Sequence, residues 1–144
     1  MIIIEGKPKY VYYVGSAFTV EWFMDIKGRM KAKEYYEDLP EEDQERLDEL
    51  VKYLADNPIG TRLPKNLYNE EDPENKIYAF KPRAHRFFNF MTIGRKIIIV
   101  GAYRKHSQAM TKKDLNLLKT VVASKHDYQN SAKAGTYYDR IPQS

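Results

Sequence analysis

The sequence predicts an α+β domain in which a helical hairpin and a C-terminal helix pack on a small, mainly antiparallel sheet. Apolar and polar residues alternate over residues 18–26, which is typical of a half-buried strand. Two short segments with helical spacing follow, and three strand-like segments come next. A final segment with helical spacing begins at residue 112 and completes the order β, α, α, β, β, β, α.

The predicted helical hairpin begins with one apolar stripe at helical spacing, formed by Ala32, Tyr35, Tyr36 and Leu39. Pro40 then opens a second helix, whose first turn is acidic, as the helix dipole favours. The pair Asn57-Pro58 ends this second helix, because proline cannot continue it. The join between the helices is short, so we expect them to hide one apolar face together.

The second half of the chain is predicted to hold three strands and a helix. Residues 58–75 are rich in proline and are predicted to form a loop. Strands are predicted over residues 77–81, 85–92 and 97–103. The last of these is apolar on both sides at residues 97–100, which indicates a central strand covered on both faces. Thr111 and Asp114 resemble a capping box ahead of a helix over residues 112–127.

A chain of 144 residues with 42% hydrophobic content is large enough for one domain with a core. We expect the domain at residues 18–128, an N-terminal extension at 1–17 with a possible extra strand at 10–14, and a polar C-terminal tail at 129–144. Cysteine is absent, so disulfides and thiolate chemistry are excluded. The opening apolar run is too short for a signal peptide, and no run reaches the length of a membrane span. We therefore expect a cytoplasmic protein without membrane contact.

Charge is strongly segregated along the chain. Residues 34–75 hold fourteen Asp/Glu against four Lys/Arg, a net charge of −10, whereas residues 76–128 hold twelve Lys/Arg against two Asp/Glu, a net charge of +10. A polyanion responds to the local field, so the basic segment is a candidate phosphate-binding surface despite a total charge of only +4. Two oppositely charged solvated faces would explain the same pattern, and charge alone does not separate these interpretations.

The residues suited to chemistry form two clusters in the basic segment. The first lies where one strand turns into the next, and the second lies at the end of the central strand: Lys81, Arg83, His85 and Arg86, then Arg104, Lys105 and His106. Antiparallel pairing is expected to bring both clusters to one side of the sheet, with Lys112, Lys113 and Lys119 widening the basic surface. No carboxylate pair is expected nearby, which disfavours a glycosidase. The three histidines lack metal-ligand spacing and no cofactor motif occurs, so neither metal nor cofactor is expected.

A cationic cluster of this kind suits RNA cleavage by the RNA's own 2′-hydroxyl. Arginine holds a phosphate in its fork, and a lysine or histidine crowded by cations can transfer protons. Simple phosphate binding by the same residues is the competing interpretation. His85 is expected to be a partly buried, hydrogen-bonded histidine, and the aromatic residues around it are expected to be mostly core.

The order of elements and several short segments resemble the RelE/HigB-like toxins of bacterial toxin–antitoxin systems, in particular their phage-derived HigB-like branch. The most specific segment is Lys105-His106-Ser107-Gln108 followed by Thr111-Lys112-Lys113-Asp114-Leu115. Further likeness lies in Ile77-Tyr78-Ala79-Phe80 and Arg86-Phe87-Phe88-Asn89-Phe90, and in the start of the hairpin at residues 31–40. The resemblance covers about residues 18–128.

The resemblance implies a RelE-like fold and a metal-independent mRNA endonuclease, or mRNA interferase, that acts on the ribosome. It implies inhibition by a cognate antitoxin, often a helix-turn-helix protein. Carried over by position, Lys81 and Arg83 contact RNA phosphate, Arg86 stabilises the transition state, and Arg104 and Lys105 lie beside it. His106 stands where the family often has lysine, and we infer an acid–base role for it. Lys112 and Lys113 are predicted to bind RNA.

Two alternatives remain open. ParE-like toxins share the fold but inhibit DNA gyrase, so the fold does not fix the target. A non-catalytic, phage-derived binding module is the other alternative.

Overall fold

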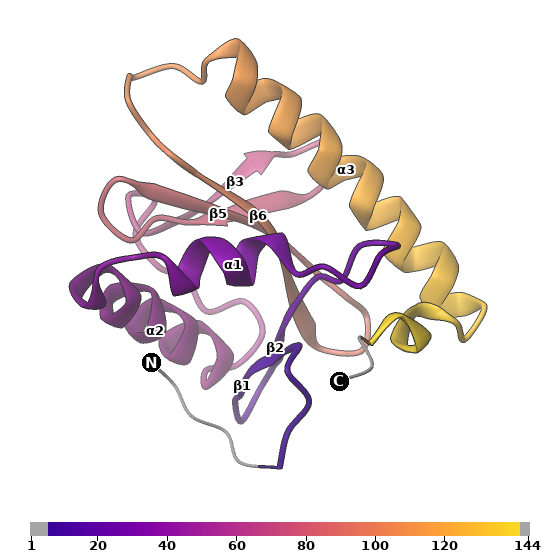
Figure 1. The fold of residues 1–144 in the computed structure, drawn as a ribbon. Helices are drawn as coiled ribbons and strands as arrows, with labels where there is room; N and C mark the ends of the chain where they lie inside the picture. The colour runs from indigo at the N-terminus through magenta and orange to yellow at the C-terminus, as the bar shows by residue number, and fades with distance from the viewer. Residues whose placement is uncertain (1–5, 142–144) are drawn as a thin grey trace.

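The computed structural model describes residues 6–141, which form one six-stranded mixed sheet with helices on both faces (Figure 1). The apolar run at residues 1–4 and the last three residues lie outside the described part of the chain. The α+β fold class and the C-terminal helix are confirmed. Among residues 6–141, no helix has the length and apolar character needed to cross a lipid bilayer.

The strands lie in the order β1-β2-β6-β5-β4-β3 across the sheet. In that order they are Val11–Val14, Thr19–Trp22, Lys96–Arg104, His85–Met91, Ile77–Phe80 and Tyr68–Asp72. Four neighbouring pairs are antiparallel and only β2 and β6 run parallel, so the prediction of a mainly antiparallel sheet is confirmed. The long apolar strand β6 is central, as its apolar run predicts.

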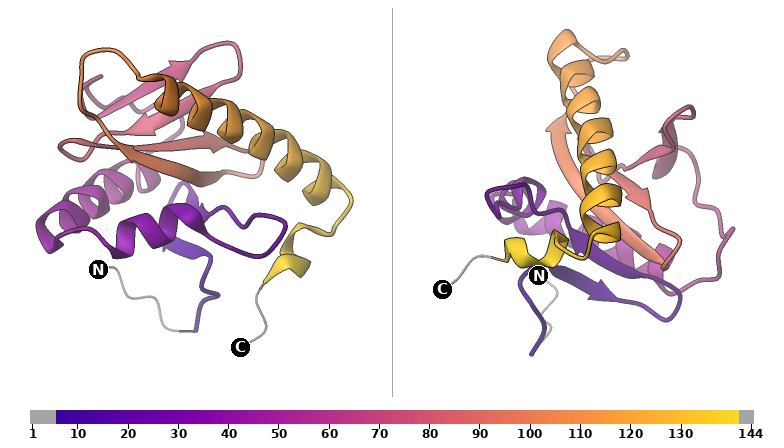
Figure 2. Two further views of the ribbon diagram at one scale, coloured as in Figure 1. Left: turned by 45° about the horizontal axis from the view of Figure 1, so that its top comes forward. Right: turned by 90° about the vertical axis from the view of Figure 1, so that its right-hand side faces the viewer.

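The helices divide between the two faces of the sheet (Figure 2). On one face lie α1 (Lys31–Glu37) and α2 (Glu41–Ala55), and on the other lie α3 (Lys112–Lys133) and the short 3₁₀ helix η1 (Tyr137–Arg140). Each face has its own buried cluster. Below, these are called the α1–α2 face and the α3 face.

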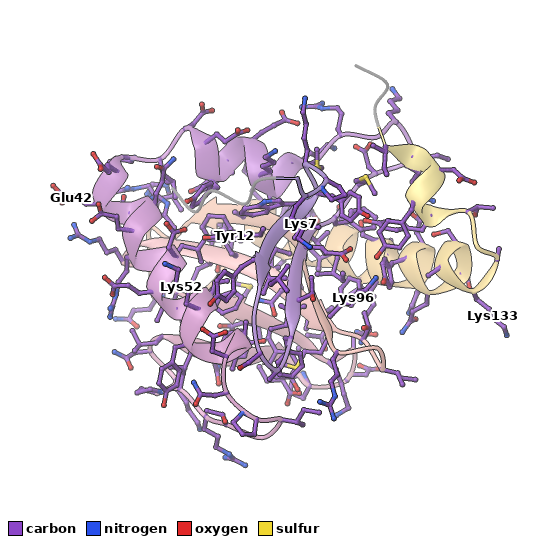
Figure 3. The ribbon with its side chains drawn as sticks, turned by 90° about the horizontal axis from the view of Figure 1, so that it is seen from below. Lys7, Tyr12, Glu42, Lys52, Lys96 and Lys133 are labelled. Carbon is purple, nitrogen blue, oxygen red and sulfur yellow. The ribbon has the colours of Figure 1, made fainter. Side chains whose placement is uncertain are left out.

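Aromatic and apolar side chains pack beneath α1 and α2. Trp22 stacks on Tyr12 with ring centroids 4.4 Å apart, and both lie beneath Tyr36 of α1. The hydroxyls of Tyr12 and Tyr36 both donate to Asp48 Oδ1 of α2, at 2.5 and 2.7 Å. Figure 3 shows Tyr12 between β1 and α2. These hydrogen bonds connect the first strand to both helices. They also satisfy polar groups that would be costly to bury unpaired.

The predicted loop at residues 58–75 contains a strand that the sequence did not reveal. Residues 68–72 form β3, which pairs with β4 at the edge of the sheet. The sequence Asn69-Glu70-Glu71-Asp72 shows no apolar alternation, because an edge strand is only partly covered. The remainder of the segment is loop and turn, as its prolines predict.

The C-terminal segment differs from the expected polar tail. Helix α3 continues to Lys133, six residues beyond its predicted end, and η1 then packs against the sheet. Tyr137 is fully buried, and its hydroxyl accepts a hydrogen bond from the backbone N–H of Met24. Arg140 donates to both carboxylate oxygens of Asp127 at 2.7 Å. Composition misses this segment because the buried Tyr137 and the half-buried Tyr138 anchor a mostly polar sequence.

Some local predictions are confirmed directly. The possible extra strand at residues 10–14 is β1. Thr111 and Asp114 form the predicted capping box at the start of α3, with reciprocal hydrogen bonds of 3.2 and 3.0 Å. Glu21, placed on the polar face of its strand by the alternation, is instead 3% exposed. It accepts a hydrogen bond from the hydroxyl of Tyr138 and forms an ion pair with Lys96.

Candidate functional site

A small polar hollow of about 80 Å³ lies between the edge of the sheet and the start of α3, on the α3 face. Three cations from the predicted clusters line it, namely Lys81, Arg86 and Lys105. Glu71, Tyr103 and Asp114 form further parts of its wall, and the loop that leads from β6 to α3 lines the remaining side. In Figure 1 this loop arches over the upper end of the sheet.

The strand register explains why these residues meet. Arg86 on β5 stands directly opposite Tyr103 on β6, so their side chains share a face. Lys81 follows the end of β4, which pairs with β5. The backbone N–H of Lys105 donates to the carbonyl of Ala84 at 2.7 Å, which fixes the start of the basic loop against the β4–β5 turn.

Arg86 is held in place by its own turn. Its Nη1 donates to the carbonyls of Arg83 and His85, at 2.7 and 2.9 Å. Within residues 6–141, no hydrogen bond from its Nε or Nη2 is found. These N–H groups are therefore available to a ligand, and a guanidinium fixed on one side is preorganised to hold a phosphate oxygen on the other.

Lys81 and Lys105 differ in their partners. The Lys81 ammonium lies 2.9 Å from Glu71 Oε1, and both side chains are mostly covered, at 15% and 19% exposure. The half-buried Lys105 makes no side-chain hydrogen bond or ion pair within the part of the chain that the structure describes. The hollow therefore holds more positive charge than its carboxylates neutralise.

Tyr103 brings a hydroxyl into this charged environment. Its ring packs on Phe88 with centroids 5.5 Å apart. Burial raises the pKa of Tyr103 above its ordinary value of 10.0, the carboxylates of Asp114 and Glu71 raise it further, and Arg86 opposes them. The hydroxyl therefore stays protonated at neutral pH and can donate a hydrogen bond.

Glu71 and Asp114 correct the expectation that no carboxylate pair lies near the basic cluster. Asp114 is one half of the capping box and accepts a hydrogen bond from the Thr111 N–H, so its role at the start of α3 is accounted for. Glu71 lies on the edge strand that the sequence did not reveal, and for that reason sequence reasoning missed it. Asp114 already serves the helix cap and only Glu71 has no such role, so paired-carboxylate chemistry of the glycosidase type remains disfavoured.

Two other predicted site residues lie on the α1–α2 face. Arg83 forms ion pairs with Glu42 and Asp43 of α2, at 3.2 and 3.5 Å. Arg104 stands opposite His85, so these two side chains share a face. Figure 3 shows Glu42 at the outer end of α2. Strand alternation separates Arg104 from the hollow, and Arg83 lies in the β4–β5 turn, where its ion pairs hold it beside α2.

His85 is buried and hydrogen-bonded, as predicted. Its Nε2 lies 3.1 Å from Asp43 Oδ2, and its Nδ1 lies 2.7 Å from the hydroxyl of Tyr35. A carboxylate can only accept, so the Nε2–H donates to Asp43, and in the neutral ring Nδ1 then accepts from the Tyr35 hydroxyl. The ring therefore joins β5 to both helices of the hairpin.

The remaining predicted residues lie outside the hollow. His106 is exposed in the basic loop. Lys112 lines a separate open groove of about 410 Å³ between α3 and the end of β3, where Leu115 and Leu118 provide apolar walls. Lys113 is exposed in the first turn of α3. These lysines extend the basic surface beyond the hollow.

Metal and family comparisons add two findings. Residues 6–141 contain no group of three or more His, Asp or Glu side chains placed to hold a metal ion. Neither the protein-family models nor the curated proteins contain a match to this chain.

Proposed function

We propose that this protein is the toxin of a toxin–antitoxin system and cleaves mRNA on the ribosome without a metal. The observation that carries the proposal is the convergence of Lys81, Arg86 and Lys105 on one hollow from three separate segments. A volume of about 80 Å³ is the space of two or three waters, which suits a phosphoryl group better than a nucleobase. The sequence resemblance to RelE/HigB-like toxins supports the same reaction.

The proposed reaction is attack of the RNA 2′-hydroxyl on the adjacent phosphorus. The 2′-oxygen–phosphorus bond forms, the bond to the 5′-oxygen breaks, and the products carry a 2′,3′-cyclic phosphate and a 5′-hydroxyl. Negative charge builds up on the nonbridging oxygens in the transition state. The free N–H groups of Arg86 are suited to bind these oxygens, and such preorganised donors are usually the largest single contribution to catalysis.

The leaving 5′-oxygen needs a proton, for which the hollow offers two donors. Lys105 has an ammonium without an ion-pair partner among the described residues, and the protonated hydroxyl of Tyr103 lines the same hollow. We assign proton delivery to Lys105 and a hydrogen bond to the phosphate to Tyr103. His106 is exposed in the loop, and we keep for it only contact with RNA or ribosome.

The proposed partners follow from the same surface. Lys112 and Lys113 at the start of α3 would bind RNA phosphates next to the hollow. A cognate antitoxin, which we expect to be a helix-turn-helix protein, would have to cover this basic surface to inhibit the toxin.

The test is induction of the protein in a bacterial host, followed by mapping of mRNA 5′ ends on translating ribosomes. We expect growth arrest and new 5′ ends in frame with the codons, both lost in Arg86→Ala. Thermal unfolding of the purified variant checks that its fold is retained. Arrest with intact mRNA and damaged DNA would replace the proposal with gyrase inhibition, and absence of arrest would favour a binding module.

A further inference from the structure

We infer that Glu71 is the group that accepts the proton of the RNA 2′-hydroxyl, an inference that rests on the proposed function. It assigns a catalytic residue outside the basic segment, on the edge strand β3. The proton acceptor is the one role in the proposed reaction for which the three cations of the hollow offer no suitable group, because a protonated lysine or arginine has no lone pair to accept with.

The negative charge of Glu71 opposes phosphate binding in the hollow. A carboxylate that lines a phosphate-sized hollow repels the phosphate and weakens ground-state binding. Glu71 nevertheless lines the hollow together with Arg86 and Tyr103, and its side chain is only 19% exposed. A site that only binds phosphate gains nothing from this carboxylate, whereas a site that must remove a proton requires an acceptor.

The carboxylate of Glu71 is anchored through one of its two oxygens. Glu71 Oε1 forms an ion pair with Lys81 at 2.9 Å, which fixes the carboxylate at the wall of the hollow. Within residues 6–141, no hydrogen bond to Oε2 is found. One oxygen is therefore anchored while the other remains able to accept a proton. Asp114 differs in that its Oδ2 accepts from the Thr111 N–H in the cap of α3, a structural role that already accounts for this carboxylate.

The resulting step balances in protons and bonds. Glu71 takes the 2′-hydroxyl proton as the 2′-oxygen–phosphorus bond forms, and Lys105 gives a proton as the bond to the 5′-oxygen breaks. Glu71 ends as a carboxylic acid and Lys105 as an amine. Exchange with solvent after product release restores both.

The competing role for Glu71 is neutralisation of Lys81 alone, and the two roles predict different kinetics. Glu71→Gln keeps the size of the side chain and removes the charge. If Glu71 is the proton acceptor, Glu71→Gln lowers the rate of cleavage, while RNA binding becomes tighter or stays the same. If Glu71 only neutralises Lys81, Glu71→Gln frees Lys81 for phosphate, and cleavage is then unchanged or faster.

The experiment measures single-turnover cleavage on ribosomes programmed with a defined mRNA, at a range of protein concentrations. For Glu71→Gln we expect a maximal rate reduced about hundredfold or more, within the range found for general bases. Binding is measured separately on ribosomes carrying the same mRNA with a 2′-deoxy nucleotide at the cleavage position. There we expect the dissociation constant of Glu71→Gln to equal or fall below that of the wild type.

Two further variants make the outcome decisive. Glu70→Gln removes the neighbouring charge of β3, which does not line the hollow, and should leave the maximal rate within about twofold. Glu71→Asp retains a carboxylate and should cleave at least tenfold faster than Glu71→Gln. A Glu71→Gln rate within threefold of the wild type overturns the inference while the proposed function stands. A wild type that does not cleave overturns both.

Discussion

The two faces of the sheet differ in how far carboxylates neutralise the basic residues that lie on them. On the α1–α2 face, Arg83 meets Glu42 and Asp43, and Asp43 also holds His85. On the α3 face, the three cations of the hollow face one carboxylate that is not committed to a helix cap. The acidic hairpin therefore folds back on only part of the basic segment. Positive charge is left available on the α3 face, which the acidic hairpin does not reach.

The largest effect should come from the fold of the α3 face rather than from its charges. Tyr137 is fully buried and packs on Tyr128 with ring centroids 4.7 Å apart. Tyr137→Ala removes that packing and its hydrogen bond with Met24, and should lower the free energy of unfolding by about 3–5 kcal/mol. Urea unfolding measures it. Tyr53→Ala on α2, where the ring is 48% exposed, is the control and should cost under about 1 kcal/mol.

The α1–α2 face should show a smaller effect on stability and little on activity. Asp43→Asn removes the charge that pairs with His85 and Arg83, and should lower the free energy of unfolding by about 1–2 kcal/mol. Cleavage on programmed ribosomes should stay within about twofold, because neither partner lines the hollow. A large loss of cleavage at unchanged stability would instead place this face in the active site.

The salt dependence of RNA binding tests whether Lys105 of the hollow contacts a phosphate. If Lys105 contacts one phosphate, Lys105→Gln should reduce the slope of log affinity against log salt by about 0.7 for single-stranded RNA. Lys133→Gln is the matched control, because Lys133 lies in the last turn of α3, shown at the far end of that helix in Figure 3. Fluorescence anisotropy with a labelled RNA at several salt concentrations gives both slopes. Equal slopes for the two variants would remove Lys105 from the phosphate site.

The smallest effect concerns Tyr103 and pH. Burial raises the pKa of Tyr103 above its ordinary value of 10.0. The hydroxyl is therefore protonated at every pH below 10.0 and remains so somewhat above that pH. Tyr103→Phe should therefore reduce the cleavage rate by a constant factor, about three- to tenfold, between pH 6 and 9. Single-turnover rates across this range test the constancy. A ratio that shrinks toward pH 9 would mean that the hydroxyl ionises in that range.

Much of the fold follows from the sequence, because its main elements carry strong periodic signals. The apolar run of β6, the start of α2 after Pro40 and the capping box at Thr111 are local patterns and were predicted correctly. The edge strand β3 was missed, because Asn69-Glu70-Glu71-Asp72 has no apolar alternation. The C-terminal anchor was missed as well, because Tyr137 is buried by contacts with residues more than a hundred positions away.

The candidate site was predictable only in part. Sequence proximity correctly grouped Lys81, Arg86 and Lys105, which line one hollow. It also grouped Arg83 and Arg104 with them. Arg83 lies in the β4–β5 turn and pairs with α2, and the face on which Arg104 lies depends on register, which a one-residue change reverses. Glu71 was out of reach, since its approach to Lys81 depends on the pairing of β3 with β4.

The central claim is that the hollow on the α3 face, and not the basic residues of the α1–α2 face, carries out the reaction. A matched pair of arginines only three residues apart tests it most directly. Single-turnover cleavage on programmed ribosomes should fall about 100- to 1,000-fold in Arg86→Ala, the range for loss of a transition-state donor, and stay within about threefold in Arg83→Ala. Equal losses in both variants, or a greater loss in Arg83→Ala, would contradict the account.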